Sequence, residues 1–298
     1  MSTAPAARRL LLVHAHPDDE TITTGATIAH YVAQGVDVTV VTCTLGEDGE
    51  ILVPAYAQLE SAQADQLGGL RIGELAGAMQ ALGVADHRYL GGAGRWRDSG
   101  MMGTAANTHP RAFWRANTDA GVFDAAVAEL VAVIREVRPQ VVVTYDDFGD
   151  YGHPDHIMAH RVTTAALERA GDSAHPGGPT WDVAKFYWTA TPRSVLRRGY
   201  DAVRARPDVD FDTADEPAFG VADEVVTTVV DASAHAGQKA AALRSHATQV
   251  LVHDEFFALS NRLGREISGV EHYRLVRGEP AVADDGREHD LFAGVTGA

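Results

Sequence analysis

The chain has 298 residues, of which 45% are hydrophobic and 22% are charged, as is usual for a water-soluble globular protein. Its formal net charge of −16 argues against binding to nucleic acid or to an anionic membrane surface, because both require clustered Lys and Arg. The single cysteine, Cys43, excludes an intrachain disulfide and a thiolate zinc cluster. No segment near the start resembles a cleaved leader, and no stretch approaches the ~20 apolar residues of a spanning helix. We therefore expect a cytoplasmic protein.

Strand-like apolar runs alternate with helical patterns in the first part of the chain. Strands are expected at 10–14, 38–45, 87–90 and 141–145, and helices at 20–34, 58–82, 121–137 and 154–170. Gly68 and Gly69 indicate a break inside the second helical pattern. This order predicts an α/β fold of the Rossmann-like type, a mostly parallel sheet with helices on both faces. In such a doubly wound sheet the first and fourth strands are neighbours.

The composition and the strand–helix pattern of the sequence change after Gly171. A Gly/Pro/Ser-rich connection is followed by expected strands at 183–190, 223–230 and 273–276, a polar loop at 204–217 and an Ala-rich helix at 232–249. The tail from Pro280 is expected to be loosely ordered. We predict a Rossmann-like catalytic domain with a metal site at residues 1–171, and a smaller α+β portion packed on it at 172–298.

Two short motifs of the chain are built alike. Ala15–Glu20 reads AHPDDE and Tyr151–His156 reads YGHPDH, and each stands between a strand-like run and a helical pattern. Such turns lie at the carboxyl edge of the sheet, where open α/β folds keep their active sites. One HPD tripeptide alone is typical of a capped turn. Two of them after neighbouring strands predict a hydrolytic metal site in one crevice.

The simplest ligand set takes two residues from the first motif and one from the second. A catalytic zinc ion needs three protein ligands and one exchangeable water, and His16, Asp19 and His156 supply the three. Asp18 projects differently from Asp19, so it is the expected general base for water whose pKa the metal lowers to about 7. Iron(II) would accept the same ligands.

The second motif also offers groups for stabilising a reaction intermediate. His153 is expected near the open side of the metal, where an imidazolium stabilises an oxyanion or protonates a leaving amine. Asp155 is the expected partner that holds its ring and raises its pKa. Tyr151 is placed to donate a hydrogen bond to the oxyanion. Together these groups indicate amide or ester hydrolysis.

At these residues the chain resembles the LmbE-like (PIG-L) deacetylases, zinc enzymes that remove an acetyl group from N-acetylglucosamine-containing compounds. Their hallmarks are an AHPDDE turn and a later HPDH turn, and both are intact here. The segments VVTCTLGEDGE, QLGGLRIGEL and YLGGAGRWRDSGM are similar to one branch of the family, the mycothiol-pathway deacetylases of N-acetylglucosaminyl-inositol. The resemblance covers at least residues 10–165.

The resemblance implies a role for individual residues. It makes His16, Asp19 and His156 the ligands of one zinc ion per subunit, with Asp18 as base and His153, Asp155 and Tyr151 in supporting roles. It also implies a sugar-binding pocket formed by Arg71, Asp98, Glu50 and Met101, although the residues alone would place Arg71 and Asp98 on the surface. The implied partner is a small amino-sugar inositol substrate, with no nucleic acid or membrane, and the oligomeric state stays open.

Three other functions compete with this reading. The same zinc machinery would serve a mycothiol S-conjugate amidase or a deacetylase of another N-acetylglucosamine glycoside, although the segment RWRDSGM favours the inositol branch. A non-catalytic metal- or sugar-binding protein is the rival from a different class. The intact Asp18 argues against it, because metal retention alone needs no base.

Overall fold

A computed structural model of the protein describes residues 7–295. Its main sheet has seven strands in the order β3-β2-β1-β4-β5-β10-β6. Their bounds are β1 (Arg9–His14), β2 (Asp37–Thr42), β3 (Asp86–Tyr89), β4 (Val141–Thr144), β5 (Lys185–Thr189), β6 (Thr228–Asp231) and β10 (Val270–Arg277). The first five strands pair in parallel, whereas β10 is antiparallel to β5 and β6. The expected Rossmann-like class and the β1–β4 adjacency are confirmed.

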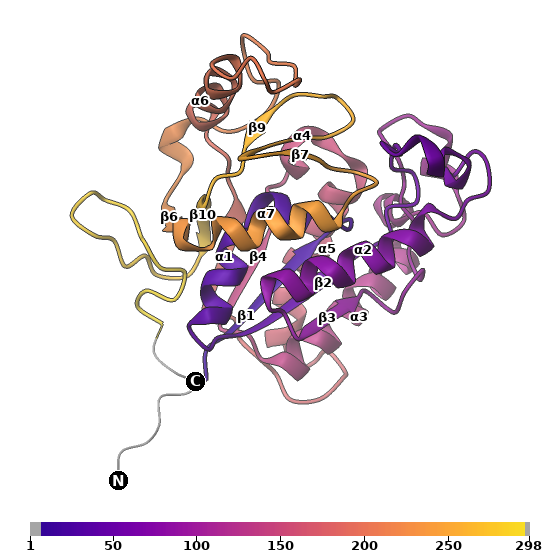
Figure 1. Ribbon diagram of the computed structural model, residues 1–298. Coiled ribbons are helices and arrows are strands. Elements are labelled where there is room, and N and C mark those ends of the chain that lie inside the picture. Colours follow the sequence, from indigo (N-terminus) through magenta and orange to yellow (C-terminus); the bar gives the residue numbers. More distant parts are fainter. Residues whose placement is uncertain (1–6, 296–298) are drawn as a thin grey trace.

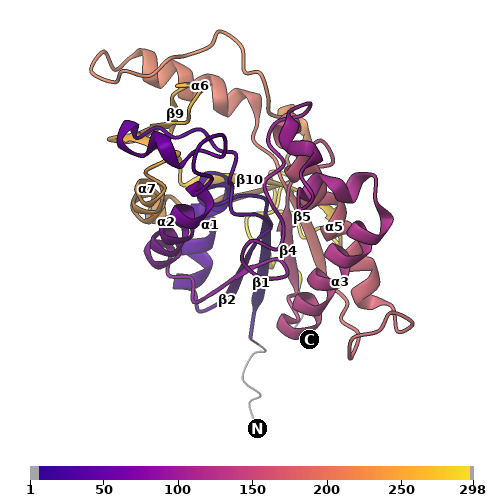
Figure 2. The ribbon, with the colours of Figure 1, turned by 90° about the vertical axis from the view of Figure 1, so that its right-hand side faces the viewer.

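Helices cover both faces of this sheet (Figure 2). One layer holds α1 (Asp19–Ala33), α2 (Leu67–Leu82) and α7 (Ala236–Ser245), and the other holds α3 (Ala120–Val137) and α5 (Pro154–Gly171). Strand β1 contributes to both cores: Leu10 and Leu12 pack on one side, and Leu11 and Val13 on the other. A strand buried on both faces explains the unbroken apolar run of the sequence.

Smaller elements lie at the upper end of the molecule in Figure 1. They include α4 (Gly149–Gly152), α6 (Arg193–Arg204) and a second sheet of β7 (Leu251–His253), β8 (Phe256–Ala258) and β9 (Arg265–Glu266). Short 3-10 turns complete the described elements: η1 (Pro54–Leu59), η2 (Ala105–Thr108), η3 (Phe113–Asn117), η4 (Asp223–Val225) and η5 (Ser233–His235). None of the helices described between residues 7 and 295 is long and apolar enough to cross a membrane.

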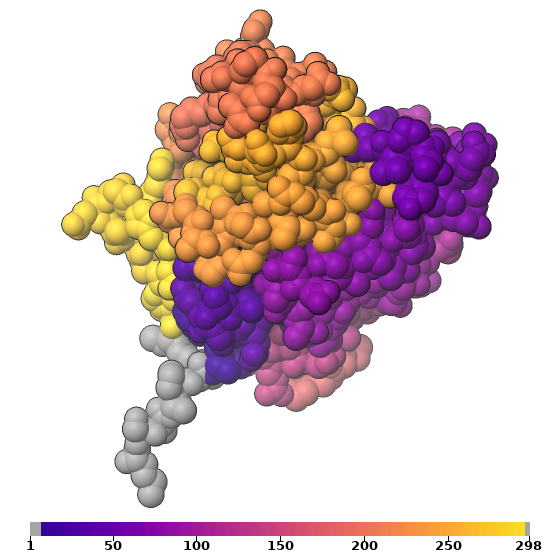
Figure 3. Space-filling model, in the orientation of Figure 1, coloured from indigo at the N-terminus to yellow at the C-terminus, as the bar shows by residue number. Residues whose placement is uncertain are grey.

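Residues from both predicted portions share the main sheet. Strands β5, β6 and β10 follow residue 171 and extend the sheet from β4. Helix α7 packs against α1 and α2, and the space-filling view shows these late residues resting on the N-terminal ones (Figure 3). The division at residue 171 stays a prediction, but the first strands and the late strands are parts of one layer.

Several expected element boundaries differ from the structure. The second helical pattern begins at Leu67, so Gly68 and Gly69 lie inside α2 rather than at a break. Gly68 is required there because a Cβ would stand 2.7 Å from the Glu47 side chain. The strand expected at 223–230 begins at Thr228, and the helix expected at 232–249 spans only 236–245. Helix α6 was not expected; it buries Leu196, Tyr200 and Val203 along one face.

The tail after Pro280 is more ordered than its composition indicates. Glu288 is fully buried, and its carboxylate accepts hydrogen bonds from Lys185 Nζ, Tyr187 Oη at 3.0 Å and Thr228 Oγ1 at 3.0 Å. Leu291 is also fully buried. A buried carboxylate needs such partners, and the sequence does not reveal them because they lie on distant strands. The tail is therefore anchored to the sheet.

We predict that Glu288→Gln destabilises the fold, because it leaves the buried Lys185 ammonium without its counter-charge. Breaking one partner of a buried ion pair costs about 3–5 kcal/mol of unfolding free energy. Urea denaturation measures the change. The matched control is Asp285→Asn, because Asp285 makes an exposed pair with His289, worth about 0–1 kcal/mol. Equal effects of the two substitutions would mean that Glu288 does not anchor the tail.

Candidate active site

The two motifs meet at the carboxyl edge of the sheet. Strands β1 and β4 are paired in parallel, with Leu10 opposite Val141 and Leu12 opposite Val143, so the turns that follow them are neighbours. The His16 ring centroid lies 4.6 Å from that of His153 and 5.2 Å from that of His156. The crevice expected from the sequence is therefore present.

The three expected metal ligands converge on one point. The Asp19 Oδ2 atom lies 3.2 Å from His16 Nδ1 and 3.3 Å from His156 Nε2. Donor atoms around a tetrahedral zinc ion, at about 2.0–2.1 Å from it, are about 3.3 Å apart. Neither ring nitrogen of the buried His156 has a hydrogen-bond partner among residues 7–295, and Nε2, which faces Asp19, is therefore free to bind a metal. This donor set fits zinc or iron(II).

Electrostatics keeps Asp19 charged. Burial by itself would raise the pKa of the Asp19 carboxyl, but the imidazoles of His156 and His16 outweigh it and hold that pKa well below its usual range. A second group of donors, His16, His153 and His156, also has nitrogens within 4.8 Å of one another. We prefer the set that contains Asp19, because its Oδ2 atom lies 3.2 and 3.3 Å from nitrogens of His16 and His156, the spacing of donors around a zinc ion.

The Asp155 carboxylate contacts a different histidine from the one expected. Its Oδ2 atom lies 3.2 Å from His16 Nε2 and accepts the Ser99 N–H at 2.8 Å, and its Oδ1 atom accepts the Ser99 hydroxyl. A carboxylate on the far nitrogen of a metal-binding histidine fixes the ring and its tautomer. Asp155 is fully buried at the first turn of α5, where it faces His16 rather than His153.

His153 is consequently a neutral residue in the structure. It caps α5, and its Nδ1 atom accepts the Asp155 N–H at 3.2 Å. Burial, with the neighbouring His16 and His156 rings, lowers the pKa of the His153 imidazole to about 2, so the expected raised pKa is not found. The carboxylate of Asp98 lies 4.0 Å away, too far for a hydrogen bond. The single ring proton therefore resides on Nε2, the atom that faces Asp98.

Asp18 is held in an unusual backbone conformation. Its φ of 99° is rare outside glycine, and its N–H donates to Glu20 Oε2 at 3.0 Å. The Arg71 guanidinium lies 3.1 Å from the Asp18 carboxylate and also donates to the Pro17 carbonyl. Burial raises the pKa of the Asp18 carboxyl to about 6, and Arg71 opposes that shift. A carboxylate with a pKa near the working pH is suited to general-base catalysis.

Arg71 lies in the interior and contacts this turn. Only 3% of the residue is exposed, and its Nη1 atom donates to the Gly46 carbonyl at 2.7 Å. Gly46 has a φ of 65°, and a Cβ at that position would collide with the guanidinium. The sequence placed Arg71 on a helix surface and the resemblance placed it against a sugar. In the structure its hydrogen bonds are made to the first motif and to the Gly46 carbonyl.

The other residues of the expected sugar pocket differ in burial. Asp98 is buried, with Oδ1 at 3.6 Å from His16 Nε2, and it accepts the Gly100 N–H at 2.8 Å. Met101, which follows on the same loop, is 49% exposed, and Glu50 is exposed on a neighbouring loop. Tyr151 is 44% exposed, and its ring centroid lies 4.9 Å from that of His156. Asp98 and Tyr151 thus border the crevice, whereas Met101 and Glu50 are exposed on loops.

Sequence reasoning missed three residues that support the site. Ser99 holds Asp155, and it lies in the segment RWRDSGM, of which only Asp98 and Met101 were expected to be site residues. Tyr145 follows strand β4; its ring stacks on His156 at 4.1 Å, and its hydroxyl accepts the Ala15 N–H at 2.9 Å. His246 follows α7, and its Nε2 atom lies 2.9 Å from Glu20 Oε1. No local pattern could link His246 to a motif 226 residues earlier.

Solved structures of other proteins share this fold. The N,N′-diacetylchitobiose deacetylase of Pyrococcus horikoshii has a TM-score of 0.57 at 17% identity, covering 97% of this chain and 87% of that one. The 4-carboxy-2-hydroxymuconate hydratase of Pseudomonas putida also has a TM-score of 0.57, at 19% identity, covering 93% of this chain and 98% of that one. A deacetylase and a hydratase thus share one fold, and the likeness carries no further than the fold.

Sequence comparison is more specific. The family described as GlcNAc-PI de-N-acetylase (PIG-L) matches residues 11–167. The 1D-myo-inositol 2-acetamido-2-deoxy-alpha-D-glucopyranoside deacetylase of Geodermatophilus obscurus is 60% identical over 98% of this chain and 99% of its own length. The enzyme of the same name from Thermobispora bispora is 57% identical over 97% and 99%. With both hallmark turns assembled at one sheet edge, this chain belongs to the PIG-L (LmbE-like) family of deacetylases.

Proposed function

We propose that this protein is a zinc-dependent hydrolase that removes the N-acetyl group from N-acetylglucosaminyl-inositol, a step of mycothiol biosynthesis. The observation that carries the reaction class is the meeting of Asp18 with His16, Asp19 and His156 at one sheet edge. The substrate follows from the names of relatives that match this chain over nearly its full length. The buried, unpaired thiol of Cys43 suits the cytoplasm as the compartment.

The residues of the chain divide the proposed reaction between them. When bound, the metal supplies Lewis-acid chemistry, polarising the amide carbonyl and lowering the pKa of water. Asp18 accepts a proton from the attacking water and later passes it to the departing amine nitrogen. His153 donates a hydrogen bond from Nε2 to the oxygen that becomes negative, and Tyr151 at the mouth of the crevice supplies a second donor. Asp155 keeps the His16 ring oriented.

Arg71 acts on the base in this proposal and does not need to touch the sugar. Its guanidinium holds both the carboxylate of Asp18 and the carbonyl of Pro17, so it fixes the direction in which the base points. The Glu20 carboxylate accepts a hydrogen bond from the Asp18 N–H in the same turn, and the His246 ring is hydrogen-bonded to that carboxylate. The strained backbone of Asp18, with its φ of 99°, is stable only because several surrounding contacts fix it. Such strain is concentrated at active sites.

The first prediction from the proposed function separates a metal ligand from the base. His156→Ala should lose metal and activity together, because a three-ligand site cannot spare a ligand. Asp18→Asn should keep its metal while turnover falls by roughly 10²–10⁴-fold, the usual contribution of a general base. Metal content after gel filtration and the rate of amine release measure the two effects, and elemental analysis also distinguishes zinc from iron. Equal metal loss in both variants would make Asp18 a ligand.

The second prediction concerns Arg71. If the guanidinium positions Asp18, Arg71→Gln should lower kcat by about 10- to 150-fold with little change in KM, since a hydrogen bond to a charged group is worth about 1.5–3 kcal/mol. In an Asp18→Asn background the same substitution should have little further effect, because the group that it positions is gone. A raised KM with unchanged kcat would instead support direct sugar binding.

The third prediction tests the substrate. Wild-type protein is assayed in parallel on N-acetylglucosaminyl-inositol, on methyl N-acetylglucosaminide and on a mycothiol S-conjugate, with release of free amine as the readout. We expect the highest kcat/KM on the first compound. A higher kcat/KM on the S-conjugate would identify the amidase, and a higher value on the methyl glycoside would point to another N-acetylglucosamine glycoside. Metal binding without turnover of any compound would favour a non-catalytic protein.

A further inference from the structure

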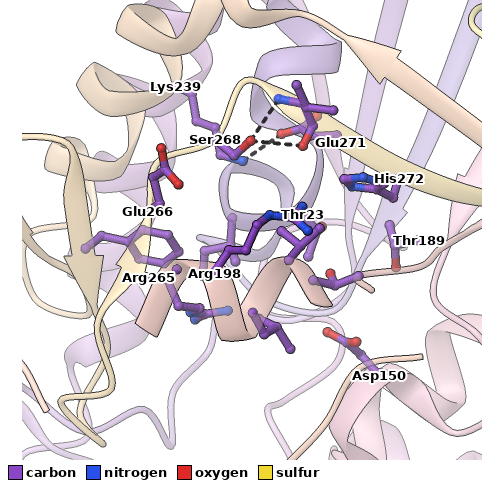
Figure 4. A pocket seen from close by; sticks show the side chains of 17 residues that line it. Thr23, Asp150, Thr189, Arg198, Lys239, Arg265, Glu266, Ser268, Glu271 and His272 are labelled. Atoms are coloured by element: carbon purple, nitrogen blue, oxygen red, sulfur yellow. Dashed lines mark hydrogen bonds and ion pairs between the residues drawn. The ribbon is translucent and has the colours of Figure 1, made fainter. Parts of the chain in front are cut away.

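A cavity of about 270 Å³ is lined by residues that follow the first motif and precede the second (Figure 4). On one side it is bordered by the first turns of α1, where the Thr23 hydroxyl donates to the carbonyl of the ligand Asp19 at 2.8 Å. On another it is bordered by Asp150, the residue before Tyr151. The remaining wall comes from α6, α7, β5 and the strands around β9 and β10. The mechanism proposed above uses none of these lining side chains.

The charges around this cavity balance. Its lining contains three cationic and three acidic side chains, namely Arg198, Lys239 and Arg265 and then Asp150, Glu266 and Glu271. Lys239 Nζ and Glu271 Oε1 form an ion pair at 2.7 Å. Figure 4 shows these two residues on the opposite side of the cavity from Asp150 and Arg265. A wall with equal numbers of both signs gives no net attraction to an anion or a cation. It favours a neutral ligand with many hydroxyl groups, which both donate and accept hydrogen bonds.

Arg265 has unused donors at this cavity. Its guanidinium lies 4.7 Å from the ring centroid of Phe257 and 5.7 Å from that of Phe219, an arrangement that holds the planar group in place. The side chain is half-buried, yet among residues 7–295 it has neither a hydrogen bond nor an ion pair. A half-buried guanidinium with five free N–H donors is poised to bind acceptor oxygens that the protein itself does not provide.

Asp150 presents the complementary acceptor. Its carboxylate also has no hydrogen-bond or ion-pair partner in the described part of the chain, whereas its backbone N–H donates to Asp146 Oδ1 at 2.9 Å. The backbone of Asp150 has a φ of 66° and a ψ of −66° inside α4, a strained conformation for a residue with a side chain. Burial raises the pKa of this carboxyl to about 6, and Arg265 is among the groups that oppose the shift.

We infer that this cavity is the subsite for the polyol ring that is attached to the amino sugar. The inference rests on the proposed function and names the residues that recognise the second ring. The acetamide is on C2 of the sugar and the inositol is on the adjacent C1, so a sugar with its amide at the metal must place the inositol directly beside the metal centre. There Asp150 accepts hydrogen bonds from ring hydroxyls, and Arg265 donates hydrogen bonds to them.

Kinetics on two substrates tests the subsite. Asp150→Asn and Arg265→Gln are compared on N-acetylglucosaminyl-inositol and on methyl N-acetylglucosaminide, which lacks the second ring. The loss of kcat/KM on the inositol glycoside should reach about 10- to 150-fold and should exceed the loss on the methyl glycoside at least about ten-fold. Matched controls are Asp147→Asn on the same loop and Arg262→Gln, which pairs with Asp210 at 3.0 Å on the surface. Equal losses on both glycosides would overturn the subsite.

Direct binding of myo-inositol separates this inference from the proposed activity. Saturation-transfer NMR of the wild-type protein should show contact with free myo-inositol, and the signal should vanish in Arg265→Gln but persist in Arg262→Gln. If the wild-type protein bound inositol through Arg265 and yet hydrolysed neither glycoside, the proposed activity would fall and the subsite would stand. Hydrolysis without any binding of inositol that depends on Arg265 would remove the subsite and leave the activity.

Discussion

The parallel pairing of β1 with β4 is the constraint on which the site depends. The two strands lie far apart in the sequence, but they are adjacent at the middle of the sheet, and both end at the same edge. The turn after each strand therefore delivers its histidine to a common point, where Asp19 contacts both His16 and His156. The strands are buried on both faces, so a shift in their register would disturb two cores as well as the candidate metal ligands. Stability of the fold and precision of the site thus depend on the same contact.

Burial and ion pairing then set the protonation of the side chains that the sheet brings together. Ion pairs act on several ionisable groups at this edge: histidines hold the pKa of Asp19 well below its usual range despite burial, whereas Arg71 only partly opposes the burial that raises the pKa of Asp18 to about 6. For His153, no carboxylate among residues 7–295 lies within hydrogen-bonding distance of the ring; burial lowers its pKa, and it is neutral with Nε2 as the donor. The same low dielectric that makes unpaired charges costly strengthens hydrogen bonds to charge that develops during a reaction. The arrangement favours a site that is organised before substrate arrives.

Sequence reasoning succeeded where the information is local. Periodicity gave the first five strands of the main sheet, and the two HPD turns gave the residues that gather around Asp19, because each turn carries its own strand and helix. It did not give contacts between distant segments. The orientation of Asp155 toward His16, the burial of Arg71 and the anchoring of the tail through Glu288 all depend on which elements pack together. Helix α6 was missed although Leu196, Tyr200 and Val203 recur at helical spacing, because its many Arg residues resemble the polar loop that follows.

The fold by itself does not decide the reaction, since a hydratase has a similar one. The family match stops at residue 167, and it contains both turns and therefore the proposed metal ligands and base. The relatives with an inositol-glycoside name match far beyond that point, over almost the whole chain. His246 behind the first turn and Arg265 at the neighbouring cavity both come from this later part. The late part of the chain therefore packs behind the first turn and forms most of the wall of the neighbouring cavity, through residues of β5, α6, α7, β9 and β10.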